Sequence, residues 1–302
     1  MTLQARAGKL ASGFLKMLSL AMERAIHGLT LARTGGVNFF RVRYFDFKLR
    51  PDDIFVVTYP RSGTTLLQMI LYQALTEGSM ELEHISRFSP WFERCCSNGI
   101  DMESFPSPRI LKSHLPYRVI PKGARYIYVT RNGMDVAVSY FHFYQSHMGF
   151  RGSMRHFFHY FLRGKLHYGS WFEHVAGWHA RRGDASILFL RYEELIADRE
   201  DAVQRIAAFC GIELSPERLH RILERSSFEF MKGHEEKFDH RTEVMLEQGI
   251  RSDSFLRKGA RGDWTQHLDV YDYARFQKEL EKQLTKLGVD PASVLEEPQA
   301  AR

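Results

Sequence analysis

The stretch from Ile54 to Leu67 carries residues whose types and spacing suit an anionic ligand. It passes from an apolar run through a turn of small residues into a helical pattern. Backbone N–H groups at a helix N-terminus point at a bound phosphate, Gly63 permits close approach, and Arg61 adds a fixed positive charge. The hydroxyl donors of the turn are Ser62, Thr64 and Thr65. This pattern predicts a phosphate site, with a capped strand-to-helix turn as the structural alternative.

The same stretch differs from the loop of nucleotide triphosphatases. That loop needs Gly, four residues and then Gly-Lys-Ser/Thr, and this chain lacks both the first Gly and the Lys at that spacing. A kinase using magnesium and a triphosphate would require such a lysine. The pattern therefore favours another phosphorylated cofactor, and a nucleotide-dependent kinase stays as an alternative.

Further cationic and polar residues follow other apolar runs. His114 comes after one run, and an imidazole titrates near working pH, as a general base requires. Arg131 follows another, and Ser139 lies about two helical turns further on, so both could face one anion. Arg257, Lys258 and Gly259 form a second cationic segment. Taken singly, the histidine could be structural and the basic segment a solvated loop.

The elements that must position these residues alternate between strands and helices. Apolar β-rich runs predict strands at Ile54–Thr58, Arg109–Lys112, Tyr126–Thr130 and Ile187–Arg191. We therefore expect a single α/β domain with a central parallel sheet flanked by helices, and ligands beyond the carboxyl ends of the strands. The expected organisation is an N-terminal helical segment over 1–35, the domain over 36–290 and a tail over 291–302.

Composition limits the cellular setting. The net charge of +6 suits a polyanionic ligand, but nucleic acid, anionic membrane and a phosphorylated nucleotide all satisfy it. Three cysteines without zinc spacing predict reduced thiols in the cytoplasm, and no run is apolar enough to span a bilayer. Residues 8–33 predict an amphipathic helix that either packs on the domain or lies peripherally on a membrane. A nonenzymatic membrane or nucleic-acid binder therefore stays as a second alternative.

Several blocks, taken in order, resemble the cytosolic sulfotransferase family from about residue 50 to residue 270. The matching blocks are Tyr59–Thr65, Leu111–Pro116, Arg131–Ser139, Gly164–Phe172, Arg191–Glu194 and Arg257–Trp264. The resemblance implies an enzyme that transfers a sulfuryl group from 3'-phosphoadenosine-5'-phosphosulfate (PAPS) to a hydroxyl or amine of a small, apolar acceptor and releases PAP. It implies no metal and no nucleic-acid partner.

The resemblance also assigns roles to individual residues. His114 would be the general base, with Arg61 and Lys112 compensating charge on the transferring group. Ser62, Gly63, Thr64 and Thr65 would line a P-loop-like 5'-phosphosulfate loop. The 3'-phosphate would be held by Arg131, Ser139, Arg257, Lys258 and Gly259. Tyr192 and Phe228 would lie near the adenine.

The chain departs from the family pattern at a few positions. Family members typically have Lys and Trp where this chain has Arg61 and Leu66. An arginine keeps the charge but cannot donate a proton, and the leucine removes a stacking partner for adenine. The family's dimerisation motif is absent, because Thr265, Asp269 and Ala274 replace the expected Lys, Thr and Glu.

The segment 141–178 is rich in aromatic residues. These side chains could wall an apolar acceptor pocket or form part of the core, and the sequence leaves both interpretations open. The acceptor itself depends on pocket shape.

Overall fold

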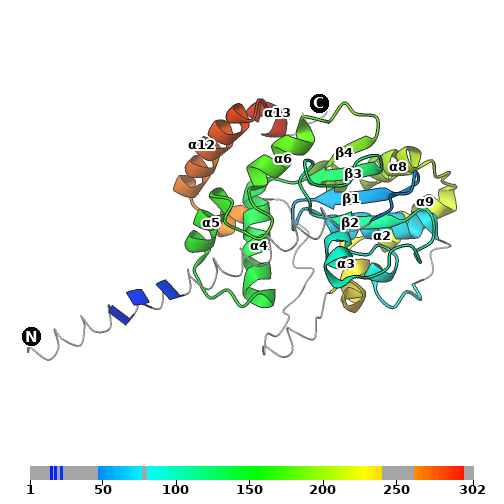
Figure 1. The fold of residues 1–302 in the computed structure, drawn as a ribbon, viewed down its shortest axis with the longest axis horizontal. Coiled ribbons are helices and arrows are strands. Elements are labelled where there is room, and N and C mark those ends of the chain that lie inside the picture. Colours follow the sequence, from blue (N-terminus) through cyan, green and yellow to red (C-terminus); the bar gives the residue numbers. More distant parts are fainter. Residues whose placement is uncertain are drawn as a thin grey trace, which may run out of the picture.

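The centre of the molecule is a parallel β-sheet (Figure 1). The computed structural model describes residues 47–76, 80–239 and 262–295, and six positions near the N-terminus. Within these residues, four strands lie in the order β2-β1-β3-β4. Their bounds are β1 Ile54–Thr58, β2 Ile110–Ser113, β3 Arg125–Thr130 and β4 Ile187–Arg191. The predicted α/β fold is confirmed.

The strand predictions agree with the structure to within one residue at each end. β1 and β4 have the predicted bounds, β3 begins one residue earlier, and β2 runs from Ile110 instead of Arg109. β1 pairs with β2 and β3, so that Ile54 lies opposite both Ile110 and Arg125. All five residues of β1 are buried, which explains its continuous apolar sequence.

Helices connect the strands and cover the sheet. In the described ranges they are α2 Thr64–Leu75, α3 Phe92–Asn98, α4 Gly133–His147, α5 Met154–Leu162, α6 Trp171–His179, α7 Tyr192–Ala197, α8 Arg199–Cys210, α9 Pro216–Arg225, α10 Phe228–Gly233, α12 Val270–Lys286 and α13 Pro291–Leu295. Short 3₁₀ helices are η1 Ile85–Arg87, η2 Glu235–Lys237 and η3 Asp263–Gln266. In Figure 1, α8 and α9 lie to the right of the strands, and α4, α5 and α12 gather to the left of them.

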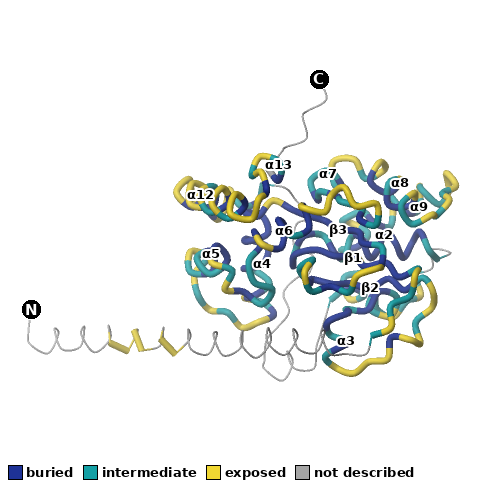
Figure 2. Tube along the Cα trace, turned by 45° about the horizontal axis from the view of Figure 1, so that its top comes forward, coloured by how far each residue is buried: buried dark blue, intermediate teal, exposed yellow. Residues whose placement is uncertain are grey.

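The two faces of the sheet have separate cores because successive side chains alternate between faces. Ile54 and Val56 of β1 pack with residues of α2, α7, α8 and α9. Phe55 and Val57 pack with residues of α3 and with Trp178 of α6. Figure 2 shows the strands as a buried centre beneath partly exposed helices. The sheet is therefore rigidly held on both sides, as a scaffold for loops should be.

A third apolar cluster joins α4, α5, α6 and α12. The aromatic side chains of segment 141–178 that are completely or almost completely buried there are Phe157, Phe158, Phe161, Trp171 and Phe172. These residues fill the core between the helices. For them, the core interpretation of the segment is therefore the correct one. Phe150 and Tyr160 are partly buried against the same cluster.

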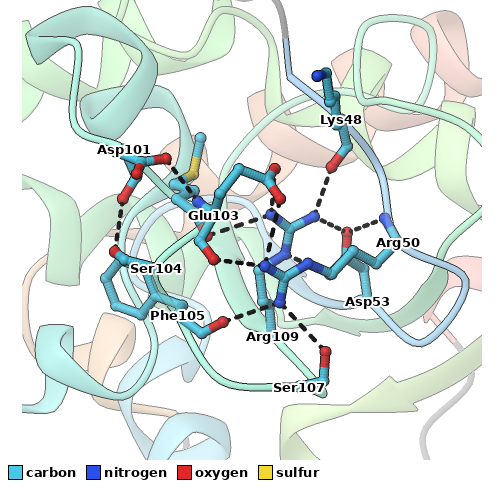
Figure 3. A network of polar contacts seen from close by, with 10 residues as sticks. Lys48, Arg50, Asp53, Asp101, Glu103, Ser104, Phe105, Ser107 and Arg109 are labelled. Carbon is cyan, nitrogen blue, oxygen red and sulfur yellow. Dashed lines mark hydrogen bonds and ion pairs between the residues drawn. The ribbon is translucent and has the colours of Figure 1, made fainter.

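A buried ion pair fastens the amino ends of two strands (Figure 3). Asp53 immediately precedes β1 and Arg109 immediately precedes β2, and both side chains are fully buried. Two hydrogen bonds of 2.7 Å join the guanidinium to the carboxylate. Arg109 also contacts Glu103 and donates to the carbonyl of Lys48. Every nitrogen of the guanidinium is thus hydrogen-bonded, and the pair ties the chain before β1 to the chain before β2.

Most of the predicted N-terminal helix lies outside the described residues. Phe14, Leu15, Met17, Leu18, Ala21 and Met22 are described as helical and exposed. Among the described residues, we find no helix with the length and apolarity that a membrane crossing demands. The stretch that was predicted to be a tail contains α13, whose Val294 is buried against α12 and its neighbours.

Candidate active site

The turn between β1 and α2 has the backbone shape of an anion site. Arg61 has φ 71° and Gly63, which precedes α2, has φ 100°. A Cβ at Gly63 would lie 2.7 Å from Cδ2 of Tyr192, so glycine is needed for both conformation and space. No side chain caps the start of α2, and its first turn has no acidic residue. The helix N-terminus therefore keeps its capacity for an anion.

Two hydroxyl groups near this turn differ in their bonding. Oγ of Ser62 is fully buried and has no hydrogen-bond partner within the described residues. Oγ1 of Thr64 lies 2.6 Å from Oγ1 of Thr58 at the end of β1. A buried hydroxyl normally has a partner, so the unsatisfied Ser62 suits a ligand oxygen at this position. These features fit a bound 5'-phosphosulfate group.

Arg131 and Ser139, predicted to bind one phosphate, each contact Arg61. Nη1 of Arg131 donates to the backbone carbonyl of Arg61 at 3.0 Å. Nε of Arg61 lies 3.2 Å from Oγ of Ser139 in α4. Arg131 and Ser139 are 9% and 8% exposed, so their polar atoms face a restricted space. The predicted residues Arg257, Lys258 and Gly259 lie outside the described residues.

Tyr192, one of the two predicted adenine residues, borders the same turn. The ring of Tyr192 packs on Gly63, and the guanidinium carbon of Arg131 lies 4.4 Å from the centroid of that ring. Phe228 begins α10 and is half-buried. Leu66 packs in an apolar cluster with Phe230 of α10, which places the start of α2 beside that helix. Tyr192 thus offers an aromatic face at the phosphate turn, while Phe228 lies on a helix that shares an apolar cluster with the start of α2.

His114 lies directly after β2, with its ring fixed against β1. Its Nδ1 is 2.9 Å from the backbone carbonyl of Thr58. A carbonyl only accepts, so Nδ1 carries the proton and Nε2 keeps a lone pair. Burial holds the pKa of His114 well below its ordinary value, and the charge of Lys112 lowers it further. The imidazole is therefore neutral at neutral pH, the state that a general base needs.

Lys112 is a buried cation close to this neutral histidine. Its Nζ lies 4.6 Å from the ring centroid of Trp91. Burial lowers the pKa of Lys112 to about 8, against a raising effect of Glu93, while Arg61 and Arg94 lower it. Lys112 is thus close enough to Arg61 for the two charges to influence each other, which suits a site for a multiply charged ligand.

Three residues that the sequence analysis did not select surround His114. The rings of Trp91 and Tyr168 approach the imidazole edge to face, with centroids 5.5 and 5.2 Å away. Glu93 accepts a hydrogen bond of 2.6 Å from the backbone N–H of His114. One signal could have indicated Glu93: it is a carboxylate within the largely apolar run from Trp91 to Cys96. Among the described residues, no cluster of three or more His, Cys, Asp or Glu could hold a metal ion.

Comparison with known proteins gives a consistent result. Residues 51–288 match the family model described as sulfotransferase domain. Sulfotransferase 1C2 of Rattus norvegicus is 37% identical over 249 residues, which cover 77% of this chain and 83% of the relative. Amine sulfotransferase of Oryctolagus cuniculus is 36% identical over 255 residues, covering 79% and 83%.

Solved structures share the fold and, by their descriptions, a ligand. Retinol dehydratase in complex with androsterone and inactive cofactor PAP superposes with a TM-score of 0.71 at 27% identity, covering 85% of each chain. Mouse sulfotransferase SULT7A1 complexed with PAP has a TM-score of 0.65 at 27% identity, covering 81% of this chain and 89% of the other. The phosphate turn thus lies in a fold whose relatives were crystallised with PAP.

Proposed function

This chain belongs to the sulfotransferase family and is a PAPS-dependent enzyme, and from that premise we propose that it sulfates a hydroxyl or amine of a small, apolar acceptor with His114 as general base. The observation that carries the proposal is the neutral imidazole, whose Nδ1 donates to Thr58 beside the phosphate turn. In the step, the acceptor oxygen or nitrogen forms a bond to sulfur and its proton passes to Nε2. The bond from sulfur to the 5'-phosphate oxygen breaks, and its electron pair leaves with PAP.

Charge compensation falls to Arg61 and Lys112 in this proposal. Nε of Arg61 donates to Oγ of Ser139, which orients the guanidinium beside the phosphate turn. Lys112 lies on β2 and His114 directly follows that strand, so the charge and the base approach the reacting atoms from the same strand end. Positioned charges of this kind stabilise the leaving oxygen without a covalent intermediate.

The cofactor would lie along the carboxyl edge of the sheet. We assign its 5'-phosphosulfate to Arg61 and the backbone and hydroxyls of Ser62, Gly63, Thr64 and Thr65. We assign its 3'-phosphate to Arg131 and Ser139, and its adenine to the surface of Tyr192 and Phe228.

Arg257, Lys258 and Gly259 would complete the 3'-phosphate site. Three residues beyond Gly259, the backbone N–H of Gly262 donates to Asp135 of α4 at 2.8 Å. The described chain therefore resumes at α4, the helix that also carries Ser139.

An apolar acceptor is supported by the aromatic edges around His114. Trp91 and Tyr168 offer apolar surface directly beside the proposed base. Androsterone and retinol are named as bound, with PAP, in the structures of retinol dehydratase. We propose a cytoplasmic enzyme, with a helical segment over 1–35, the sulfotransferase domain over 36–290 and a C-terminal segment over 291–302 that begins with α13, which packs on the domain.

We also propose that the N-terminal helix contacts anionic membrane peripherally. Its described residues include Phe14 and Met17, which are 65% and 71% exposed. Co-sedimentation of the full chain with phosphatidylserine vesicles should decrease when both are changed to Ser. Equal co-sedimentation of the variant would contradict this contact.

The cofactor site is tested by calorimetric titration with PAP, ATP and adenosine 5'-phosphosulfate in buffer with a chelator. We expect PAP to bind most tightly, and Arg131→Ala to weaken PAP more than adenosine 5'-phosphosulfate, which lacks the 3'-phosphate. Equal loss for both ligands would contradict the assignment of Arg131. A screen with labelled PAPS against 4-nitrophenol, androsterone and a primary amine then tests the acceptor class.

A further inference from the structure

Glu93 is a buried acid for which the proposed chemistry has no direct use. It belongs to the first turn of α3, and it is 1% exposed. Its Oε1 accepts the backbone N–H of His114 at 2.6 Å. Burying a carboxylate so deeply costs free energy unless the group is hydrogen-bonded and its charge is paired. Its place beside the proposed base calls for an explanation.

The segment that leads into α3 lies beside the edge strand β2 and pairs with part of it. Trp91 and Lys112 form an isolated parallel β-bridge. The N–H of Lys112 donates to the carbonyl of Pro90 at 2.9 Å. Two residues further along β2, the N–H of His114 would need the next carbonyl of such a strand. The chain has by then turned into α3, and the side chain of Glu93 supplies the acceptor instead.

Glu93 also acts through its charge. It raises the pKa of Lys112, against the lowering effects of burial and of two arginines. Burial in turn raises the pKa of Glu93 to about 7, while Lys112 lowers it. The titratable and charged groups that face this pair are His114 of the same β2 edge, Arg61 of the phosphate turn, His84 before η1, Arg94, Cys95 and Cys96 of α3, and Tyr168 of the loop before α6.

We propose that Glu93 is a positioning residue, which fixes the backbone of His114 and keeps Lys112 positively charged. This inference rests on the proposed roles of His114 and Lys112 in sulfuryl transfer. The two effects are separable, because glutamine retains an oxygen that accepts the N–H but loses the charge. Glu93→Gln therefore tests the charge, and Glu93→Ala tests the charge and the hydrogen bond together.

The direct test follows the backbone amide of His114 by NMR in protein labelled with ¹⁵N-histidine. In the wild type we expect this amide signal to shift with pH as Glu93 titrates, with a midpoint at about 7. In Glu93→Gln the shift should be lost. The matched control is Glu103→Gln, which removes a half-exposed acid from the ion-pair cluster around Arg109 and should leave the shift unchanged. An identical titration in Glu93→Gln would overturn the inference.

Transfer kinetics provide the second readout, with labelled PAPS and whichever acceptor of the screen is sulfated. Glu93→Ala should lose on the order of 100-fold in kcat, the typical cost of a misplaced catalytic group. In Glu93→Gln the loss of activity at alkaline pH should begin at lower pH, because Lys112 gives up its proton more readily.

Control outcomes separate this inference from the proposed function. If Glu93→Ala had the same kcat as Glu103→Gln, and Glu93→Gln had the same pH dependence of activity as Glu103→Gln, the positioning role would be overturned. If His114→Gln kept full transfer while the amide titration depended on Glu93, the proposed base would fail and the placement of Glu93 would stand.

Discussion

The two ends of the sheet use buried charge in opposite ways. At the amino ends, Asp53 and Arg109 form two hydrogen bonds of 2.7 Å and are fully buried (Figure 3). At the carboxyl ends, Arg61, Lys112 and Arg131 gather around a helix N-terminus and an unsatisfied Ser62. The first end balances its own charges, whereas the second is arranged to be balanced by a polyanionic ligand. Stability and function are thus located at opposite edges of the same strands.

Breaking the balanced end should have the largest effect on stability. Asp53→Ala leaves the buried guanidinium of Arg109 without its main carboxylate, a change that typically costs about 3–5 kcal/mol. Urea denaturation should show this loss in the free energy of unfolding. Glu103→Ala, which removes a half-exposed partner of the same arginine, should cost much less, because solvent screens that contact. Equal losses in the two variants would contradict the assigned importance of the buried pair.

Removing a cation from the ligand-binding end should instead weaken binding. Arg131→Ala should reduce PAP affinity by about 1.5–3 kcal/mol, the usual contribution of a hydrogen bond to a charged group. Calorimetry measures this loss directly, and the midpoint of urea denaturation without ligand should change much less than in Asp53→Ala. A large loss of stability with unchanged PAP affinity would remove the distinction between the two ends.

Lys112 provides the sharpest contrast with Arg109. Its charged form is disfavoured by burial, so Lys112→Met should raise stability by about 1 kcal/mol or more in the absence of ligand. The same change should abolish most sulfuryl transfer. Denaturation and a transfer assay on one preparation check both expectations. A destabilised but active variant would show that Lys112 is a structural cation.

The pH dependence of stability follows from the same lysine. The pKa of Lys112 is about 8 in the folded protein, below its ordinary value of 10.5, so between these two pH values the unfolded chain binds more protons. The contribution of Lys112 to stability therefore rises with pH from about 8 to 10.5. Comparing urea titrations of the wild type and Lys112→Met across this window isolates that contribution. If the free energy of unfolding changed with pH in the same way in both proteins, burial would not shift the pKa of Lys112.

The sequence predicted the parts of this picture that depend on local pattern. The strand bounds and the phosphate turn follow from apolar runs and from Gly63, which the structure requires for a positive φ and for contact with Tyr192. The pairing of Arg109 with Asp53, 56 residues away, was not predicted because such a contact has no local signature. The role of Glu93 was missed for the same reason, since it reaches His114 only after the chain folds.

Aromatic residues were the least informative part of the sequence. Phe157 and Trp171 fill the helical core, whereas Trp91 and Tyr168 lie beside the imidazole, and composition alone does not distinguish these two environments. The difference depends on which helices pack together. Predictions about the acceptor surface therefore required the three-dimensional arrangement.

The most direct test of the account is the transfer rate of His114→Gln at saturating PAPS, measured beside its PAP affinity. Glutamine can still donate a hydrogen bond to the carbonyl of Thr58, but it cannot take a proton from the acceptor. The account predicts a loss in kcat of about 10²–10⁴-fold with PAP affinity unchanged. Transfer close to the wild-type rate in a folded variant that binds PAP would contradict the proposal that His114 is the general base.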